Sequence, residues 1–214
     1  MRSIMVLNAK GGCGKSTLAT NIASFFATKG KQVALADYDP QASSLAWLEA
    51  RAEDRPPIHG IAALDQAVRP PKDTDILVID PPARIHGKDL TQFVRKAQTI
   101  VIPVLPSPMD IRAAENFIDE VQHVGRVERK EVKLALVGNR VRENTLVAGE
   151  LNQFLKGTRM SFLTILRDTQ NYIRAAERGL GIFEMAPSQV GPDLEQWAPL
   201  TRWLSSKRSI PDSA

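Results

Sequence analysis

A glycine-rich segment near the amino terminus limits the folds open to this chain more than any other feature of the sequence. Residues 8–17 read NAKGGCGKST and lie between a short apolar run and a stretch with helical periodicity. A loop of this composition between a strand and a helix is typical of phosphate-binding sites, because glycines let backbone N–H groups turn toward phosphate oxygens. The helix that follows presents the positive end of its dipole to the same anion. We therefore expect a strand–loop–helix unit that binds phosphate.

Apolar runs and helical periods alternate along the rest of the chain. The expected strands cover residues 3–7, 32–36, 76–79, 100–104, 134–137 and 162–166, and the expected helices cover residues 15–28, 43–53, 88–97, 110–124, 145–154 and 170–178. Continuous rather than alternating apolarity indicates strands that are buried on both faces. The sequence thus predicts an α/β fold, an open and mostly parallel β-sheet flanked by helices, in one domain over residues 1–214. Residues 55–71, which contain several prolines, are expected to form a surface excursion around one short helix.

Composition narrows the class of protein. Of the 214 residues, 43% are hydrophobic and 24% are charged, with a formal net charge of +4, which is the profile of a globular chain with an ordinary core. The single cysteine, Cys13, excludes an internal disulfide and a four-thiolate metal cluster, and it favours a reducing, cytoplasmic location. No run reaches the roughly 18 apolar residues of a membrane span, and no signal peptide is expected.

The glycine-rich loop supplies the groups that ATP and Mg²⁺ need. The hydroxyl of Ser16 would ligate Mg²⁺, Thr17 would support the α-phosphate, and Lys15 would reach the β- and γ-phosphates. The residues expected to hold the nucleotide here are Gly11, Gly12, Cys13, Gly14, Lys15, Ser16 and Thr17.

The loop departs from the standard form GxxxxGK[ST] in two places. Ala9 stands where the first glycine belongs, and Lys10 precedes the other glycines. The form KGGxGK[ST] resembles the deviant Walker A loop of the ParA/MinD family of ATPases, and most closely that of the small ParA-type partition and positioning ATPases, which include carboxysome-positioning proteins. This resemblance implies that Lys10 contacts nucleotide phosphate across a dimer interface. It covers nearly the whole chain and is most specific over residues 8–17, 35–41 and 76–83.

Two acidic motifs follow the second and third expected strands. Residues 37–41 read DYDPQ, similar to the second loop of the family, and residues 80–83 read DPPA, which has the form of a Walker B site. A carboxylate beside a phosphate loop can orient the attacking water or hold Mg²⁺ through water. We assign Asp39 to the water and the metal and Asp37 to its support, with an exchange of these roles left open. Asp80 is expected to bind Mg²⁺ through water.

Three later segments resemble the family more loosely. Residues 102–108, followed by Asp110, resemble the segment that lies near the dimer face. Asn139 is, by this resemblance, the residue that recognises adenine, since an amide both donates and accepts hydrogen bonds. Residues 165–181 resemble the part of ParA proteins in which arginines meet DNA phosphates. The candidates for DNA contact are Arg167, Arg174 and Arg178.

The resemblance implies an ATPase that forms a homodimer with ATP, binds DNA nonspecifically and is stimulated by a ParB-like or analogous adaptor protein. Its cargo would be a plasmid, a chromosome or a protein organelle such as the carboxysome, and its location the cytoplasm, on the nucleoid. Two alternatives stay open, a MinD-like membrane-associated positioning ATPase and a metabolic ATP-dependent ligase on the same fold. The membrane version would use the C-terminal stripe formed by Trp197, Leu200, Trp203 and Leu204. Such a stripe more often packs on a sheet, so no membrane partner is expected.

Overall fold

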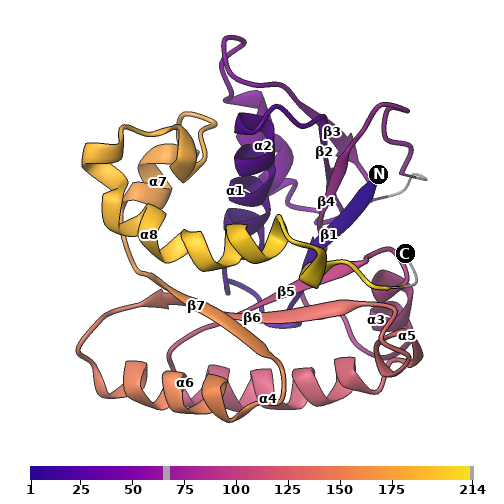
Figure 1. The fold of residues 1–214 in the computed structure, drawn as a ribbon, viewed down its shortest axis with the longest axis vertical. Coiled ribbons are helices and arrows are strands. Elements are labelled where there is room, and N and C mark those ends of the chain that lie inside the picture. Colours follow the sequence, from indigo (N-terminus) through magenta and orange to yellow (C-terminus); the bar gives the residue numbers. More distant parts are fainter. Residues whose placement is uncertain (65–67, 213–214) are drawn as a thin grey trace.

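The computed structural model describes residues 1–64 and 68–212, in which helices and strands alternate along the chain (Figure 1). The strands are β1 (Arg2–Val6), β2 (Val33–Asp37), β3 (Ile58–Ala62), β4 (Ile76–Asp80), β5 (Thr99–Val104), β6 (Lys133–Val141) and β7 (Ser161–Arg167). The α-helices are α1 (Lys15–Thr28), α2 (Ser43–Glu49), α3 (Gly87–Val94), α4 (Pro108–Gln122), α5 (Gly125–Glu128), α6 (Leu146–Gly157), α7 (Asn171–Ala176) and α8 (Pro187–Leu204). Two 3₁₀ turns, η1 (Ile182–Glu184) and η2 (Lys207–Ser209), flank α8.

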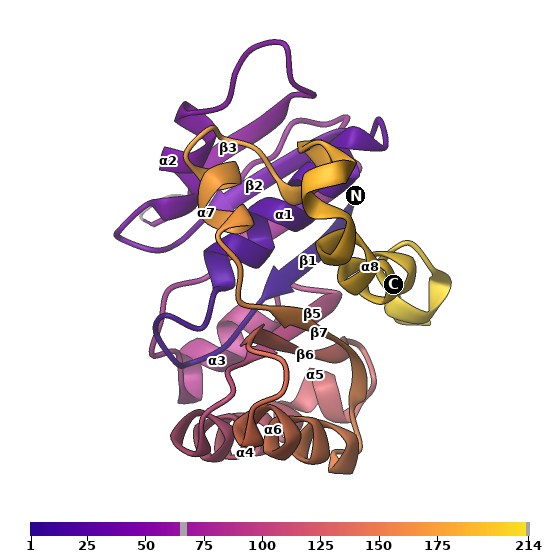
Figure 2. The ribbon, with the colours of Figure 1, turned by 90° about the vertical axis from the view of Figure 1, so that its left-hand side faces the viewer.

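The strands of the described residues form one parallel sheet in the order β3-β2-β4-β1-β5-β6-β7. Helices α1, α2, α7 and α8 cover one face of this sheet, and α3, α4, α5 and α6 cover the other (Figures 1 and 2). Because parallel strands are joined by crossovers on the faces of the sheet, all of them end at the same edge. The predicted α/β fold with a mostly parallel sheet is confirmed.

Alternate residues of each central strand enter two separate cores. In β1, Met5 packs into the core beneath α3, α4 and α6, whereas Ile4 and Val6 pack into the core with α1 and α8. All three side chains are fully buried. The continuous apolarity of the sequence in this region therefore has a simple cause, since both faces of the strand are covered.

Residues 55–71 contain a strand where the sequence suggested a short helix, and for the described part of this segment that expectation is wrong. Strand β3 pairs with β2 at the edge of the sheet. Its residues are half-buried or exposed, so it lacks the apolar run by which the buried strands are recognised. Gly60 lies close to α2, because a Cβ there would lie 2.8 Å from Cδ1 of Leu48, which would have to shift to make room. Residues 65–67 lie outside the described residues.

The C-terminal apolar stripe packs in the core, as expected. Trp197, Leu200 and Leu204 of α8 are fully buried, and Nε1 of Trp197 donates a hydrogen bond of 2.8 Å to the hydroxyl of Tyr172. Burying the indole together with a partner for its N–H makes α8 an integral layer of the fold. Among the described residues, no helix combines the length and the apolar character that crossing a bilayer requires.

A buried ion pair joins α2 to the segment that precedes α8. Helix α2 ends at Glu49, short of the expected end at residue 53, and Arg51 turns inward. Its Nη2 lies 2.6 Å from Oε1 of Glu184, and the two side chains are only 5% and 2% exposed. Burial alone would raise the pKa of Glu184, but hydrogen bonds from Arg51, the N–H of Gly181 and Ser24 hold that pKa below its usual value. Arg51 also donates to the carbonyls of Gly179 and Pro56, so this charge is fully solvated by protein groups.

Replacing Arg51 tests how much this pair stabilises the fold. Removing one partner leaves the other as an uncompensated buried charge, so Arg51→Met is expected to lower the free energy of unfolding by about 3 kcal/mol. The surface pair of the half-buried Arg55 with the exposed Asp54, at 3.6 Å, is the control, and Arg55→Met should change the free energy of unfolding by less than about 1 kcal/mol. Urea denaturation followed by circular dichroism measures both. Equal losses in the two variants would contradict the assignment.

Candidate nucleotide-binding site

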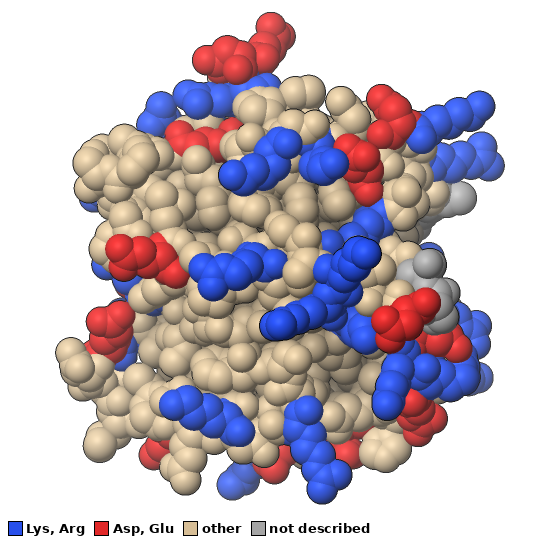
Figure 3. Space-filling model, in the orientation of Figure 1, with Lys and Arg blue, Asp and Glu red and all other residues tan. Residues whose placement is uncertain are grey.

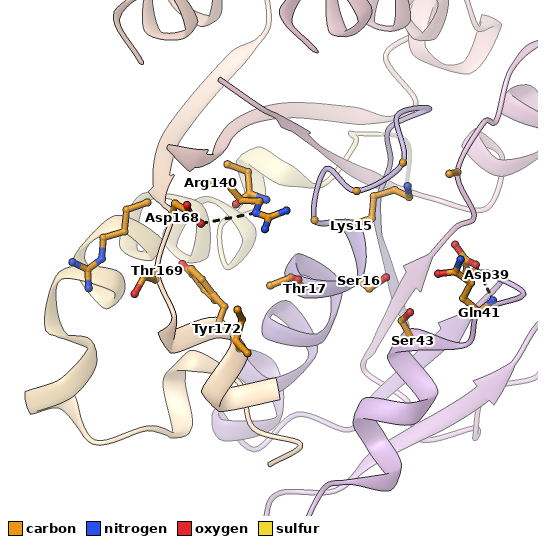
Figure 4. Close-up of a pocket in the computed structure, with 17 residues that line it drawn as sticks. Lys15, Ser16, Thr17, Asp39, Gln41, Ser43, Arg140, Asp168, Thr169 and Tyr172 are labelled. Atoms are coloured by element: carbon orange, nitrogen blue, oxygen red, sulfur yellow. Dashed lines mark hydrogen bonds and ion pairs between the residues drawn. The ribbon is translucent and has the colours of Figure 1, made fainter. Parts of the chain in front are cut away.

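A cavity of about 430 Å³ opens at the carboxyl edge of the sheet. Figure 4 shows Lys15, Ser16 and Thr17 in its centre, with Asp39, Gln41 and Ser43 on one side and Arg140, Asp168, Thr169 and Tyr172 on the other. Gly11, Gly12, Gly14 and Asn139 also line it. The structure therefore brings together most of the residues that the sequence assigned to the nucleotide. The volume of the cavity lies in the range of small-molecule and cofactor sites.

The glycine-rich loop depends on two glycines with left-handed backbone conformation. Gly12 has φ of 73° and Gly14 has φ of 92°, where a side chain would be strained. At Gly14 the space is closed as well, since a Cβ would lie 2.3 Å from Nδ2 of Asn139. Position 14 therefore requires glycine for both its backbone conformation and its close packing.

Two asparagines hold the loop in shape. Nδ2 of Asn139 donates to the carbonyl of Cys13 at 2.8 Å, and Nδ2 of Asn8 donates to the carbonyl of Pro103 at 2.7 Å. Oδ1 of Asn8 accepts from the N–H of Lys10 at 2.9 Å. The thiol of Cys13 is buried and does not line the cavity, so Cys13 can offer a ligand only its backbone. These hydrogen bonds fix the backbone of the loop at both of its ends.

The two lysines of the loop point in different directions. Lys15 is 7% exposed, and its Nζ lies 3.3 Å from the carbonyl of Lys10, so it curls back over the loop. Lys10 has a side chain that is 45% exposed and pairs with Oδ1 of Asp110, at the start of α4, at 3.3 Å. Lys10 does not line the cavity. One lysine is therefore placed for a ligand in this cavity, and the other lies on the surface beside it.

Asp37 and Asp39 have different environments. Asp37 is 2% exposed, and its carboxylate accepts from the N–H groups of Asp39, Ser44 and Leu45. Burial raises its pKa, and these hydrogen bonds act in the opposite direction. Because it binds the N–H groups of the first turn of α2, Asp37 caps that helix. Asp39 is half-buried and lines the cavity. This geometry favours Asp39 over Asp37 as the carboxylate that meets a ligand.

Asp80 lies behind the cavity at the end of β4. It is 1% exposed; Oδ2 accepts a hydrogen bond of 2.6 Å from Oγ of Ser44, and Oδ1 has no partner. Burial raises the pKa of Asp80 to about 6, against the opposing effect of the nearby Ser44 and Ser16 hydroxyls. An unpartnered, buried carboxylate oxygen near the Ser16 hydroxyl fits a hard divalent cation that keeps most of its water. The donor set of Ser16 and Asp80 thus suits Mg²⁺, with Asp39 nearer the solvent.

The wall after β7 was not assigned to the nucleotide from the sequence. Thr169, Tyr172 and Ile173 line the cavity, together with Asp168, which pairs with Arg142 at 3.1 Å. The signal that could have found them is topological, because residues that follow a parallel strand lie at the edge where the other loops meet. Ser44 was also missed, since a serine in the first turn of a helix carries no motif of its own.

The three arginines proposed for DNA lie in different settings. Arg167 lines the cavity and pairs with the fully buried Asp193, its Nε lying 2.5 Å from Oδ1. Arg174 and Arg178 lie on and just after α7, are exposed, and form no ion pair with the described residues. The geometry thus leaves Arg174 and Arg178 available to an external anion, whereas Arg167 is occupied.

The sheet order and the strand–loop–helix unit define the class of fold, a phosphate-loop nucleotide-binding fold of the ParA/MinD type. The chain belongs to the family described as the CobQ/CobB/MinD/ParA nucleotide binding domain, whose profile matches residues 4–182. The resemblance stated from the sequence is confirmed.

Two curated relatives place the chain within this family. It is 28% identical over 191 residues to the maintenance of carboxysome distribution protein A of Halothiobacillus neapolitanus. The aligned residues cover 86% of this chain and 87% of that protein. A shorter stretch of 53 residues, 25% of this chain and 21% of the relative, is 47% identical to the chromosome-partitioning ATPase Soj of Thermus thermophilus. The chain is a ParA/MinD-like ATPase that is similar to carboxysome positioning proteins.

Solved structures agree on the fold. Apo McdA of Cyanothece has a TM-score of 0.73 at 16% identity, covering 96% of this chain and 100% of that chain. In the MinC:MinD cell division complex of Aquifex aeolicus, the matching chain has a TM-score of 0.74 at 18% identity, covering 95% of each chain. At these identities the likeness shows the shared fold alone.

The unpartnered carboxylate of Asp80 leads to a stability prediction. The ionised form of a buried acid whose pKa is raised destabilises the fold at neutral pH, so Asp80→Asn is expected to raise the free energy of unfolding by about 1–2 kcal/mol without nucleotide or divalent cation. Asparagine has the same shape and keeps an acceptor for Ser44. The control is Asp54→Asn, an exposed carboxylate in a surface pair, with an expected change below about 0.5 kcal/mol. A destabilised Asp80→Asn variant in chemical denaturation would contradict this account.

Proposed function

We propose that this protein is a positioning ATPase, in which ATP and Mg²⁺ drive formation of a homodimer that binds DNA nonspecifically until an adaptor protein stimulates hydrolysis. One observation carries the proposal: the cavity joins the phosphate loop to Asp39, with Lys10 beside it, in a chain similar over 86% of its length to a carboxysome distribution protein. The cargo is a protein organelle of that kind or a DNA partition complex. The ATPase forms one domain and acts in the cytoplasm, on the nucleoid.

The nucleotide is held by the loop and by the start of α1. Backbone N–H groups of residues 11–14 surround the phosphates, Lys15 pairs with the β- and γ-phosphates, and Thr17 supports the α-phosphate. Ser16 and Asp80, with Asp39, hold Mg²⁺, which when bound neutralises phosphate charge. No described residue donates to Oδ1 of Asn139, so this oxygen is free to accept from the adenine amino group.

Hydrolysis in this proposal is mainly a matter of positioning. Asp39 lies at the cavity wall with its Oδ1 accepting from the N–H of Gln41 at 2.9 Å, so its orientation is fixed before any water arrives. Asp37 supports it by accepting its N–H at 2.9 Å. An oriented carboxylate can align a water with the γ-phosphate, and phosphoryl transfer depends on such alignment and on charge stabilisation more than on covalent chemistry.

Lys10 is the residue that connects nucleotide state to dimer formation. In this structure Lys10 pairs with Asp110 on the molecular surface, and it does not line the nucleotide cavity of the same subunit. A half-exposed lysine at this place can leave a surface ion pair of small energy and reach phosphate in a second subunit. The loss of the γ-phosphate on hydrolysis then removes the charge that held the dimer.

The dimer is tested by light scattering with ATP, with ADP and with no nucleotide. We expect the natural chain to double in mass only with ATP, and Lys10→Ala to stay monomeric while it still binds a fluorescent ATP analogue, because Lys10 does not line the cavity. Lys31→Ala, an exposed lysine at the opposite edge of the sheet, is the control and should dimerise normally. An ATP-dependent dimer of Lys10→Ala, or a dimer of the natural chain with ADP, would reject this part of the proposal.

DNA binding is tested by comparing two pairs of arginines. Figure 3 shows Lys and Arg side chains spread over the face that α8 crosses. Arg202 of α8 and Arg208 of η2 are exposed. Arg174→Ala/Arg178→Ala is expected to weaken ATP-dependent binding to duplex DNA and to reduce the log–log salt slope by about two per subunit, because each lost phosphate contact removes about one released counterion. Arg202→Ala/Arg208→Ala changes the charge equally and should leave the slope unchanged. Binding to anionic vesicles with none to DNA would favour the membrane alternative.

A further inference from the structure

Ser44 is a buried hydroxyl that the proposed function does not use. It lies in the first turn of α2, it is 0% exposed, and its Oγ donates to Oδ2 of Asp80 at 2.6 Å. A buried hydroxyl needs a hydrogen-bond partner, and here the partner is a carboxylate. Hydrogen bonds to ionised groups are about twice as strong as those between neutral groups. The contact is therefore a strong, oriented link between α2 and the end of β4.

The backbone of Ser44 makes a second link to the neighbouring strand. Its N–H donates to Oδ2 of Asp37 at 2.9 Å, and Asp37 and Asp80 are register partners on β2 and β4. Oδ1 of Asp37 in turn accepts the N–H of Asp39 at 2.9 Å. A continuous chain of hydrogen bonds thus runs from Asp39 through Asp37 and Ser44 to Asp80, and Ser44 is the member that joins the two buried acids.

The hydroxyl fixes which oxygen of Asp80 is left over. Because Oδ2 is held by Ser44, the carboxylate cannot rotate freely, and Oδ1 stays as the buried oxygen without a partner. Without the Ser44 hydroxyl, neither oxygen of this buried carboxylate would be held in its present direction. Loss of a group that hydrogen-bonds a metal-binding side chain commonly lowers metal affinity by about 10- to 100-fold.

We propose that Ser44 is a positioning residue that orients Asp80 toward the divalent cation and makes the start of α2 part of the metal site. The inference rests on the proposed binding of Mg²⁺ and ATP. It implies that α2, which also follows Asp39 and Gln41 in the chain, is held to the metal carboxylate by one side chain. If Ser44 served packing alone, its loss would not change the affinity of the site for the cation.

The chain offers a matched control for the loss of a buried serine hydroxyl. Ser24 is also 0% exposed and also donates to a buried carboxylate, Oε2 of Glu184, at 2.7 Å. Glu184 keeps further partners in Arg51 and the N–H of Gly181, and neither Ser24 nor Glu184 lines the cavity. Ser44→Ala and Ser24→Ala therefore remove similar contacts, one at the site and one away from it.

The test measures release of a fluorescent ATP analogue from the full chain as Mg²⁺ is titrated, with thermal unfolding of each variant recorded in parallel. We expect Ser44→Ala to need about tenfold more Mg²⁺ for half-maximal slowing of release, with release in EDTA changed less than about twofold. Ser24→Ala should need the natural concentration, even if its unfolding temperature falls as far. In an Asp80→Asn background, Ser44→Ala should add no further change, because its effect passes through that carboxylate.

Three results would overturn the inference even if the metal site itself is present. The first is an unchanged Mg²⁺ requirement in Ser44→Ala, and the second is an equal increase in Ser24→Ala; either leaves the proposed function intact if the natural chain depends on Mg²⁺. The third is an additive effect of Ser44→Ala in the Asp80→Asn background, which would show an action that does not pass through Asp80. Retention of the analogue by the natural chain that is equal in EDTA and in Mg²⁺ would reject the metal site itself, and with it this role of Ser44.

Discussion

The parallel register of β1, β2 and β4 is the constraint on which the rest of the site depends. Strands that are buried on both faces and run in one direction deliver every following loop to a single edge. In that register Asp37 lies beside Asp80, and the loop that begins after β1 lies between them and β5. Polar groups that are far apart in the sequence therefore become neighbours at this edge of the sheet.

Burying charge is costly, and the structure offsets that cost in different ways at different residues. Asp37 uses three backbone N–H groups and in return caps α2. Glu184 is met by an arginine, a backbone N–H and a serine hydroxyl. Asp80 alone among these three acids keeps an oxygen without a partner. A satisfied acid stabilises its surroundings, whereas an unsatisfied one is a position that a ligand can complete.

Helix α2 is short, yet it is held at both ends by such groups. Its first turn is tied to the buried acids of β2 and β4, and its last turn is tied to the chain before α8 through Nε1 of Trp47, which donates to the carbonyl of Leu180, and through Arg51. The same region after β7 supplies the opposite wall of the cavity, including Tyr172. The two sides of the cavity are therefore mechanically connected behind it, through contacts that no local sequence pattern contains.

The sequence by itself determined the α/β class, six of the strands, the phosphate loop with its second lysine, and the acids at the strand ends, because continuous apolarity, glycine spacing and strand-terminal polarity are local properties of the chain. It did not reveal β3, an edge strand whose residues are half-buried or exposed and which therefore lacks an apolar run. Tertiary structure alone decided that Asp37 is a helix cap and Asp39 a cavity residue, although both stand in one five-residue motif. It also decided that Arg167 is paired inside while Arg174 remains outside, and that Ser44 meets Asp80. These outcomes depend on which groups are brought within hydrogen-bond distance when β2, β4, α2 and α8 pack together, and such distances are set by the fold rather than by neighbours in sequence.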